Sequence, residues 1–213
     1  MLDEPRPLLR GTLHLVAALL APAGLVALMF IADSPRRYVG AAIFSTSLIL
    51  LYTSSAGYHL IPWSDRLHGV AKRIDHSMIF VFIAGTYTPF CLIVLDYRWG
   101  IPMLSIVWTL AAFGVVSAVF WPQAPRRLTV GTYLGLGWIG IIPAVQVVSV
   151  MSHGQLSLLA LGGALYTIGA IIYAIRWPNP YPRVFGFHEV FHACVIAGSA
   201  IHFALIAIYV ANA

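Results

Sequence analysis

The sequence predicts an all-α integral membrane protein, built as a bundle of seven helices that span the bilayer. Two observations predict this class. Of the 213 residues, 60% are hydrophobic and only 9% are charged, whereas a soluble domain carries about 25% charged residues. The apolar residues also form seven long runs without strict alternation, which is typical of spanning helices of roughly 20 residues and not of barrel strands. We therefore expect a single membrane domain over residues 1–213.

Short segments that contain proline and charged residues separate the seven runs, for example DSPRR, PQAPRR and RWPNPYPR. Proline ends or kinks a helix, and charged side chains favour the membrane surface. In chain order, the spans are expected at approximately 13–32, 39–60, 77–95, 101–121, 130–151, 156–175 and 187–211.

The basic residues indicate the orientation of the bundle. With seven spans, nine of the twelve Lys and Arg residues fall on the side that holds the N-terminus. Cytoplasmic loops are enriched in Lys and Arg, so we expect the N-terminus in the cytoplasm and the C-terminus outside. The net charge of +5 does not indicate nucleic-acid binding, because the basic residues lie in short clusters that suit anionic lipid headgroups.

A glycine-rich segment in the fifth span resembles a nucleotide-binding motif. Gly135, Gly137 and Gly140 spell G-x-G-x-x-G, but the dinucleotide-binding motif requires a strand before it. We attribute these glycines instead to close packing between helices, with Gly131 and Gly135 forming G-x-x-x-G.

Several ionisable residues lie near one end of the expected spans, where such residues are costly and usually functional. His59 ends the second span, and Ser55 lies one turn before it on the same face. Asp75 precedes the third span. His188 and His192 lie in the first two turns of the seventh. In the expected orientation, all these residues share one depth near the cytoplasmic face.

The spacing of these histidines predicts a zinc site. Residues i and i+4 lie about 40° apart around a helix and about 6 Å apart along it, so His188 and His192 can reach one ion. His59 can supply a third nitrogen, and three protein ligands with water are the usual plan of catalytic zinc. Three simpler interpretations remain: packing histidines, Asp75 as a carboxylate at a helix N-terminus, and Ser55 bonded to its own helix. They do not explain the shared depth.

The segment from His188 also spells H-E-x-x-H, a zinc motif of soluble proteases. Adjacent helical residues project about 100° apart, so Glu189 is not expected to face the metal. The motif also lies on the last span, with no acidic residue after it, and we therefore disfavour a protease. His202 lies too deep to share the ion and is expected to bond a neighbouring helix. His14 is expected to be solvated near a span end.

Four segments together resemble the hemolysin III family, the bacterial branch of the progestin and adipoQ receptor family: SSAGYH, RIDHSMIFVFIAGTYTPF, GTYLGLGWIG and HEVFHACVIAGSAIHF. The resemblance implies seven helices with the N-terminus inside, and a zinc ion held by His59, His188 and His192. It also maps the aspartate and the serine of the family onto Asp75 and Ser55.

The resemblance further implies hydrolysis of a lipid amide or ester, as in ceramidases, with a role in membrane-lipid homeostasis in the bacterial cytoplasmic membrane. In this hypothesis zinc activates water, Asp75 accepts a proton, and Ser55 hydrogen-bonds a ligand or the oxyanion. The expected partners are membrane lipids, and the substrate enters laterally. The alternatives are a non-enzymatic sensor or regulator with structural zinc, and a hemolysin. A pore fits poorly, because no helix face is continuously polar.

Overall fold

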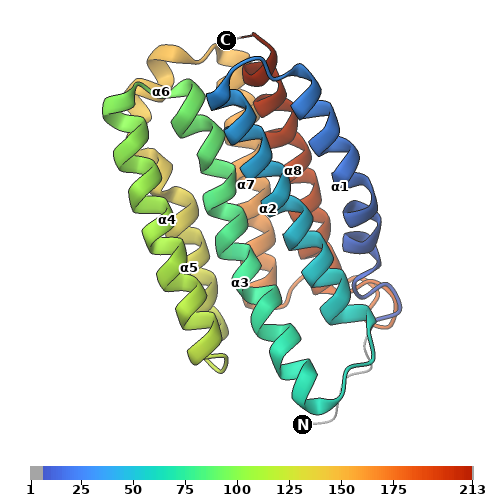
Figure 1. Cartoon of the computed structure of the whole chain (residues 1–213). Helices are drawn as coiled ribbons and strands as arrows, with labels where there is room; N and C mark the ends of the chain where they lie inside the picture. The colour runs from blue at the N-terminus through green and yellow to red at the C-terminus, as the bar shows by residue number, and fades with distance from the viewer. Residues whose placement is uncertain (1–6, 213) are drawn as a thin grey trace.

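The computed structural model describes residues 7–212 and shows long helices running side by side (Figure 1). This part of the chain contains no β-strand, and six of its helices are long and apolar enough to span a membrane. The predicted all-α membrane bundle is therefore confirmed. The elements in chain order are α1 (Thr12–Ile31), α2 (Pro35–Leu60), α3 (Asp65–Pro89), η1 (Phe90–Val94), α4 (Tyr97–Phe120), α5 (Arg126–Trp138), η2 (Ile139–Ile141), α6 (Ala144–Val150), α7 (His153–Ile175) and α8 (Phe187–Asn212).

The segment expected as the fifth span, residues 130–151, is a broken helix. α5 continues through η2 and meets α6 at an angle of 56°. Pro143 lies at the break and has no N–H with which to continue the helix. The hydroxyl of Tyr87 from α3 hydrogen-bonds to the backbone at this break. It donates to the carbonyl of Gly137 at 2.5 Å and accepts from the amide of Gly140 at 2.8 Å. Broken backbone at membrane depth requires such internal partners.

The glycines before this break do not pack against a helix, so the G-x-x-x-G prediction was wrong. Within the described chain, no neighbouring atom lies within 4 Å of a Cβ added to Gly131, Gly135 or Gly137. At Gly140, in contrast, an added Cβ would lie 3.0 Å from the Tyr87 hydroxyl. Among these glycines, only Gly140, at the helix break, is therefore closely approached by another helix.

The third helix is longer than hydropathy indicates. α3 begins at Asp65 instead of near residue 77, because the polar segment DRLHGVAKR is helical too. The other helices begin within about one turn of the expected positions. Asp75 consequently lies well inside α3, which excludes its interpretation as a carboxylate at the helix N-terminus.

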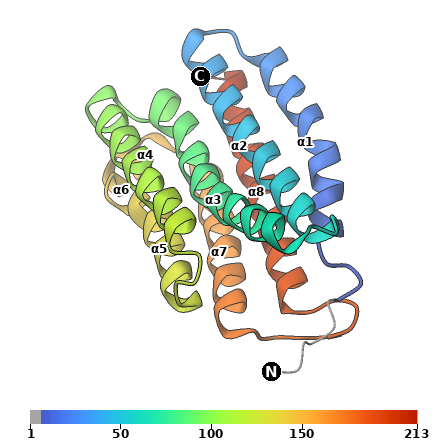
Figure 2. The same ribbon diagram turned by 60° about the horizontal axis from the view of Figure 1, so that its bottom comes forward.

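The helices α1 to α5, then α7 and α8, each contact the next, and α8 returns to contact α1. Figure 2 shows α4 and α5 on one side, α1 on the other, and α3, α7 and α8 between them. One apolar core joins α1, α2, α3 and α8 around Leu28, Phe44 and Ile206, and a second joins α3, α4 and α5 around Met103 and Val107. A cavity of about 1390 Å³ lies within the bundle, and residues of both apolar cores line it.

Candidate metal centre

The candidate metal centre lies at the end of the bundle where α2 ends and α8 begins (Figure 1). His59 is in the last turn of α2, and His188 and His192 are in the first two turns of α8. Because the two helices run in opposite directions, residues far apart in sequence meet at one depth. The structure thus brings together the three histidines that the spacing argument grouped.

One ring nitrogen from each of His59, His188 and His192 lies within 4.8 Å of the others. The Nε2 atoms of His59 and His188 are 3.1 Å apart. Two nitrogens bound to one tetrahedral zinc ion at about 2.0–2.1 Å lie about 3.3 Å from each other. The distance between His59 and His188 therefore suits two ligands of one zinc ion, and three clustered imidazoles suit zinc in donor chemistry.

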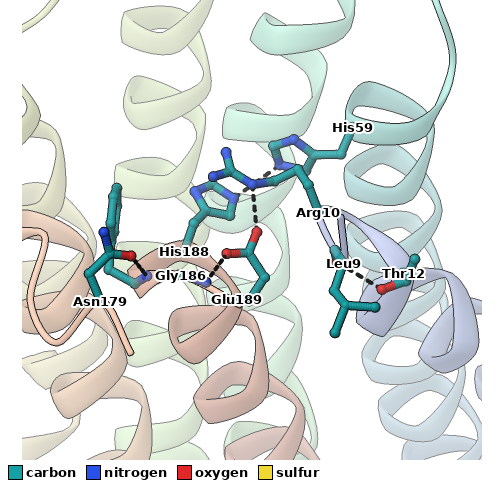
Figure 3. A network of polar contacts seen from close by, with 9 residues as sticks. Leu9, Arg10, Thr12, His59, Asn179, Gly186, His188 and Glu189 are labelled. Atoms are coloured by element: carbon teal, nitrogen blue, oxygen red, sulfur yellow. Dashed lines mark hydrogen bonds and ion pairs between the residues drawn. The ribbon is translucent and has the colours of Figure 1, made fainter. Parts of the chain in front are cut away.

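Glu189, the acidic residue of H-E-x-x-H, does not belong to this cluster (Figure 3). Its side chain is fully buried. Oε2 accepts from the amide of Gly186 at 2.7 Å, and Oε1 pairs with Nε of Arg10 at 2.6 Å. Asn179 Oδ1 accepts from the amide of Phe187 at 3.1 Å. Glu189 therefore caps the N-terminus of α8, as a glutamate three residues after the cap commonly does, and it anchors the segment before α1.

His14 contacts the centre and was missed, so its expected solvation was wrong. It is only 2% exposed, and its ring stacks on His192 with 3.7 Å between centroids and 9° between planes. Within the described chain, neither of its ring nitrogens has a hydrogen-bond partner. The depth argument that grouped the other histidines applies equally to His14, because the first span begins at the same end. That signal was present in the sequence.

Asp75 and Ser55 line the same cavity as the histidines. Both are buried, and the Ser55 hydroxyl lies beside the Asp75 carboxyl group. The Asp75 carboxyl group is not one of the clustered ligand atoms. Ser54, and not Ser55, donates to the carbonyl of Leu51 at 3.1 Å, so the simpler interpretation of a back-bonded serine applies to its neighbour. The acid and the hydroxyl thus face the cavity together, apart from the imidazoles.

Beyond the metal centre the cavity is mostly apolar. Phe82, Phe90 and Val195 contribute to its walls. His202 also lines it, and its Nε2 lies 3.2 Å from the carbonyl of Leu159 on α7, which is the bond to a neighbouring helix that we expected. Pockets for small ligands typically measure about 300–1,000 Å³. The size and the lining therefore suit a long apolar chain beside a polar end.

The comparisons with known proteins agree with the fold. A profile described as Haemolysin-III related matches residues 3–203. The hemolysin-3 homolog of Bacillus subtilis (strain 168) is 36% identical over 199 residues, covering 92% of this chain and 90% of that protein. Hemolysin-3 of Bacillus cereus is 32% identical over 203 residues, covering 92% and 88%. An adiponectin receptor protein of Drosophila melanogaster is 29% identical over 204 residues, covering 84% and 45%. This multi-pass membrane chain belongs to the Haemolysin-III-related family.

Proposed function

We propose that this protein is a zinc-dependent hydrolase of a membrane-lipid amide or ester. The main support is the set of ligands in the metal centre. Three imidazoles converge, while the carboxyl group of Asp75 stays outside the cluster. A structural zinc site usually has four protein ligands, whereas a catalytic site has three and leaves one position for water or substrate. A position left for water, with a buried acid in the same cavity, is the arrangement that hydrolysis requires.

Zinc held by His59, His188 and His192 would act as a Lewis acid and lower the pKa of water from about 15.7 toward about 7. Asp75 accepts a proton from the attacking water and delivers it to the leaving amine or alcohol. The Ser55 hydroxyl, beside that carboxyl group, donates a hydrogen bond to Asp75 or to the developing oxyanion. The carbonyl carbon gains an oxygen, the C–N or C–O bond breaks, and a fatty acid is released.

The cavity supports a lipid substrate. Its apolar wall extends from the metal centre past His202 toward the break between α5 and α6. An acyl chain in this space excludes bulk water from the reacting carbonyl group, and excluded water strengthens each electrostatic interaction there. We propose lateral entry from the bilayer, with membrane lipids as partners and no nucleic acid.

We also propose that the N-terminus and the metal centre lie on the cytoplasmic side of a bacterial cytoplasmic membrane. The support is the positive-inside bias of the sequence. In the structure, Arg10, Lys72, Arg126 and Arg176 all line the cavity at the end that holds the histidine cluster.

The test measures turnover of a ceramide and of a matched acyl ester by purified protein in lipid nanodiscs, with zinc content determined in parallel. We expect His192→Ala to lose both zinc and turnover, and Asp75→Asn to keep zinc but lose turnover. Retained turnover in Asp75→Asn would remove Asp75 from the mechanism. Undiminished turnover after chelation and in His192→Ala would overturn the zinc dependence, and no turnover of either lipid by the zinc-loaded wild type would overturn the hydrolase itself.

The second candidate is a membrane sensor or regulator with a structural zinc site. The stack of His14 on buried His192 favours it, because this contact makes the metal centre part of the packing between α1 and α8. In that case, His192→Ala lowers the thermal stability of the protein strongly, and the wild type shows no turnover to lose. The same nanodisc preparations therefore discriminate between the two functions.

A further inference from the structure

Arg126, the first residue of α5, is a partly buried cation without a counter-ion in the described chain. The two ion pairs found among residues 7–212 involve other arginines. The guanidinium group lies over the ring of Tyr173, 4.7 Å from its centroid, and over the ring of Phe187, 5.6 Å from its centroid. Nη1 donates to the Tyr173 carbonyl at 3.4 Å. A guanidinium group has five N–H donors, so this single long bond leaves most of them available.

The aromatic pair that holds Arg126 also contacts the metal centre. The ring of Tyr173 lies 5.5 Å from that of His188, centroid to centroid, and the ring of Phe187 lies 6.3 Å from it. One aromatic layer therefore separates Arg126 from a histidine of the cluster. A group bound by Arg126 would sit beside the metal centre and not in it.

Other cations gather at the same place. Arg10, Lys72 and Arg176 line the cavity with Arg126, and both Arg10 and Arg176 are close enough to Arg126 to repel its charge. Of these four, only Arg10 has an ion-pair partner in the described chain. Like charges collected in a partly desolvated cleft create a strong positive potential, which concentrates anions.

We propose that Arg126, whose guanidinium group lies over the rings of Tyr173 and Phe187, binds the anionic group of a lipid whose chain occupies the cavity. A planar guanidinium suits a phosphate or a carboxylate, because it can donate two parallel hydrogen bonds to either group. The inference rests on the proposed function and names its substrate class: a lipid amide or ester whose headgroup carries a phosphate or a carboxylate.

The chain provides a matched control in the adjacent residue. Arg127 carries the same charge in the same turn, but it is exposed and does not line the cavity. A diffuse attraction between a basic surface and anionic lipid would treat both arginines alike. Binding at a specific site would instead depend on Arg126 and not on Arg127.

The experiment measures equilibrium binding of fluorescent lysophosphatidic acid, and of monoacylglycerol with the same chain and label, to protein in phosphatidylcholine nanodiscs. We expect the wild type to bind the phosphate lipid about 10-fold more tightly than the neutral lipid, as one hydrogen-bonded charge contact gives. Arg126→Gln should abolish this preference, whereas Arg127→Gln should keep it. Arg126→Lys keeps the charge but loses the planar guanidinium group, so it should keep part of the preference. It also serves as the test variant if Arg126→Gln does not fold.

The variant His192→Ala distinguishes this proposal from the proposed hydrolysis, because it is expected to lose turnover, so that lipid binding can be measured without hydrolysis. A retained preference in His192→Ala supports the anion site whether or not the protein is a hydrolase. Equal weakening by Arg126→Gln and Arg127→Gln would overturn the proposal in favour of diffuse surface charge. Inorganic phosphate that binds as tightly as the lipid would overturn it in favour of a site for free anions.

Discussion

Replacing Glu189 by glutamine tests the role of the acidic residue in H-E-x-x-H. Glutamine keeps a carbonyl oxygen that can accept from the Gly186 amide, but it removes the charge that pairs with Arg10. We expect Glu189→Gln to lower the free energy of unfolding and to leave the zinc content unchanged, because the carboxylate contacts the helix terminus and the segment before α1, not the histidine cluster.

The magnitude follows from burial. Removing one partner of a buried ion pair costs about 3–5 kcal/mol, since the other charge is left uncompensated. The Glu189 side chain is 0% exposed, but that of Arg10 is 21% exposed, so water can screen the remaining guanidinium group. We therefore expect the free energy of unfolding to fall by about 2–4 kcal/mol. The lower part of this range is close to the contribution of one hydrogen bond to a charged group.

The assay is a double-mutant cycle of denaturant unfolding in detergent, with the wild type, Arg10→Gln, Glu189→Gln and the double variant. Residues in direct contact show coupling energies of about 0.5–3 kcal/mol, and we expect the double variant to be hardly less stable than Glu189→Gln alone. Unchanged stability together with abolished turnover in Glu189→Gln would refute this reasoning, because a catalytic base behaves in that way and a helix cap does not.

Three further variants or pairs test other parts of the structure. Zinc measured by mass spectrometry should fall to near zero in His188→Ala and stay unchanged in His153→Ala, since residue 153 is an exposed histidine outside the cluster. Tyr87→Phe should lower unfolding stability by about 1–3 kcal/mol, because it leaves backbone groups at the break unpaired. Gly114→Ala should destabilise the protein by about 1–3 kcal/mol, because the added Cβ would meet an aromatic ring at 2.3 Å. Gly131→Ala has open space around its Cβ and should be neutral or stabilising. Thermal melts compare the two variants.

The apolar runs predicted the helices well, because a bilayer demands a minimum apolar length and allows few other structures. They located α3 poorly, since hydropathy detects the part of a helix in lipid and not its polar extension from Asp65 onward. They also did not reveal the break at Pro143. A proline in an apolar run is compatible with a kink or an end, and the hydroxyl of Tyr87 that stabilises the break comes from another helix.

The histidine cluster could be predicted because the direction of each span fixes the depth of its ends. The same logic was not extended to His14, whose burial depends on packing between α1 and α8. Arg126 was counted only as a positive charge in a loop. Its stacking on Tyr173 brings together the start of α5 and the end of α7, and no local pattern in the sequence encodes that contact.

The tie between Arg10 and Glu189 has a practical consequence for handling the protein. The segment before α1 is also bonded to the loop before α8, where the amides of Leu8 and Leu9 donate to the carbonyls of Arg183 and Val184. Leu8, Leu9 and Arg10 are thus bonded to the loop before α8 and to its first turn, whereas α8 ends at the opposite end of the bundle (Figure 1). We therefore expect a fusion partner joined directly to residue 7 to disturb the end of the bundle that holds the histidine cluster, and one joined after α8 to lie at the opposite end.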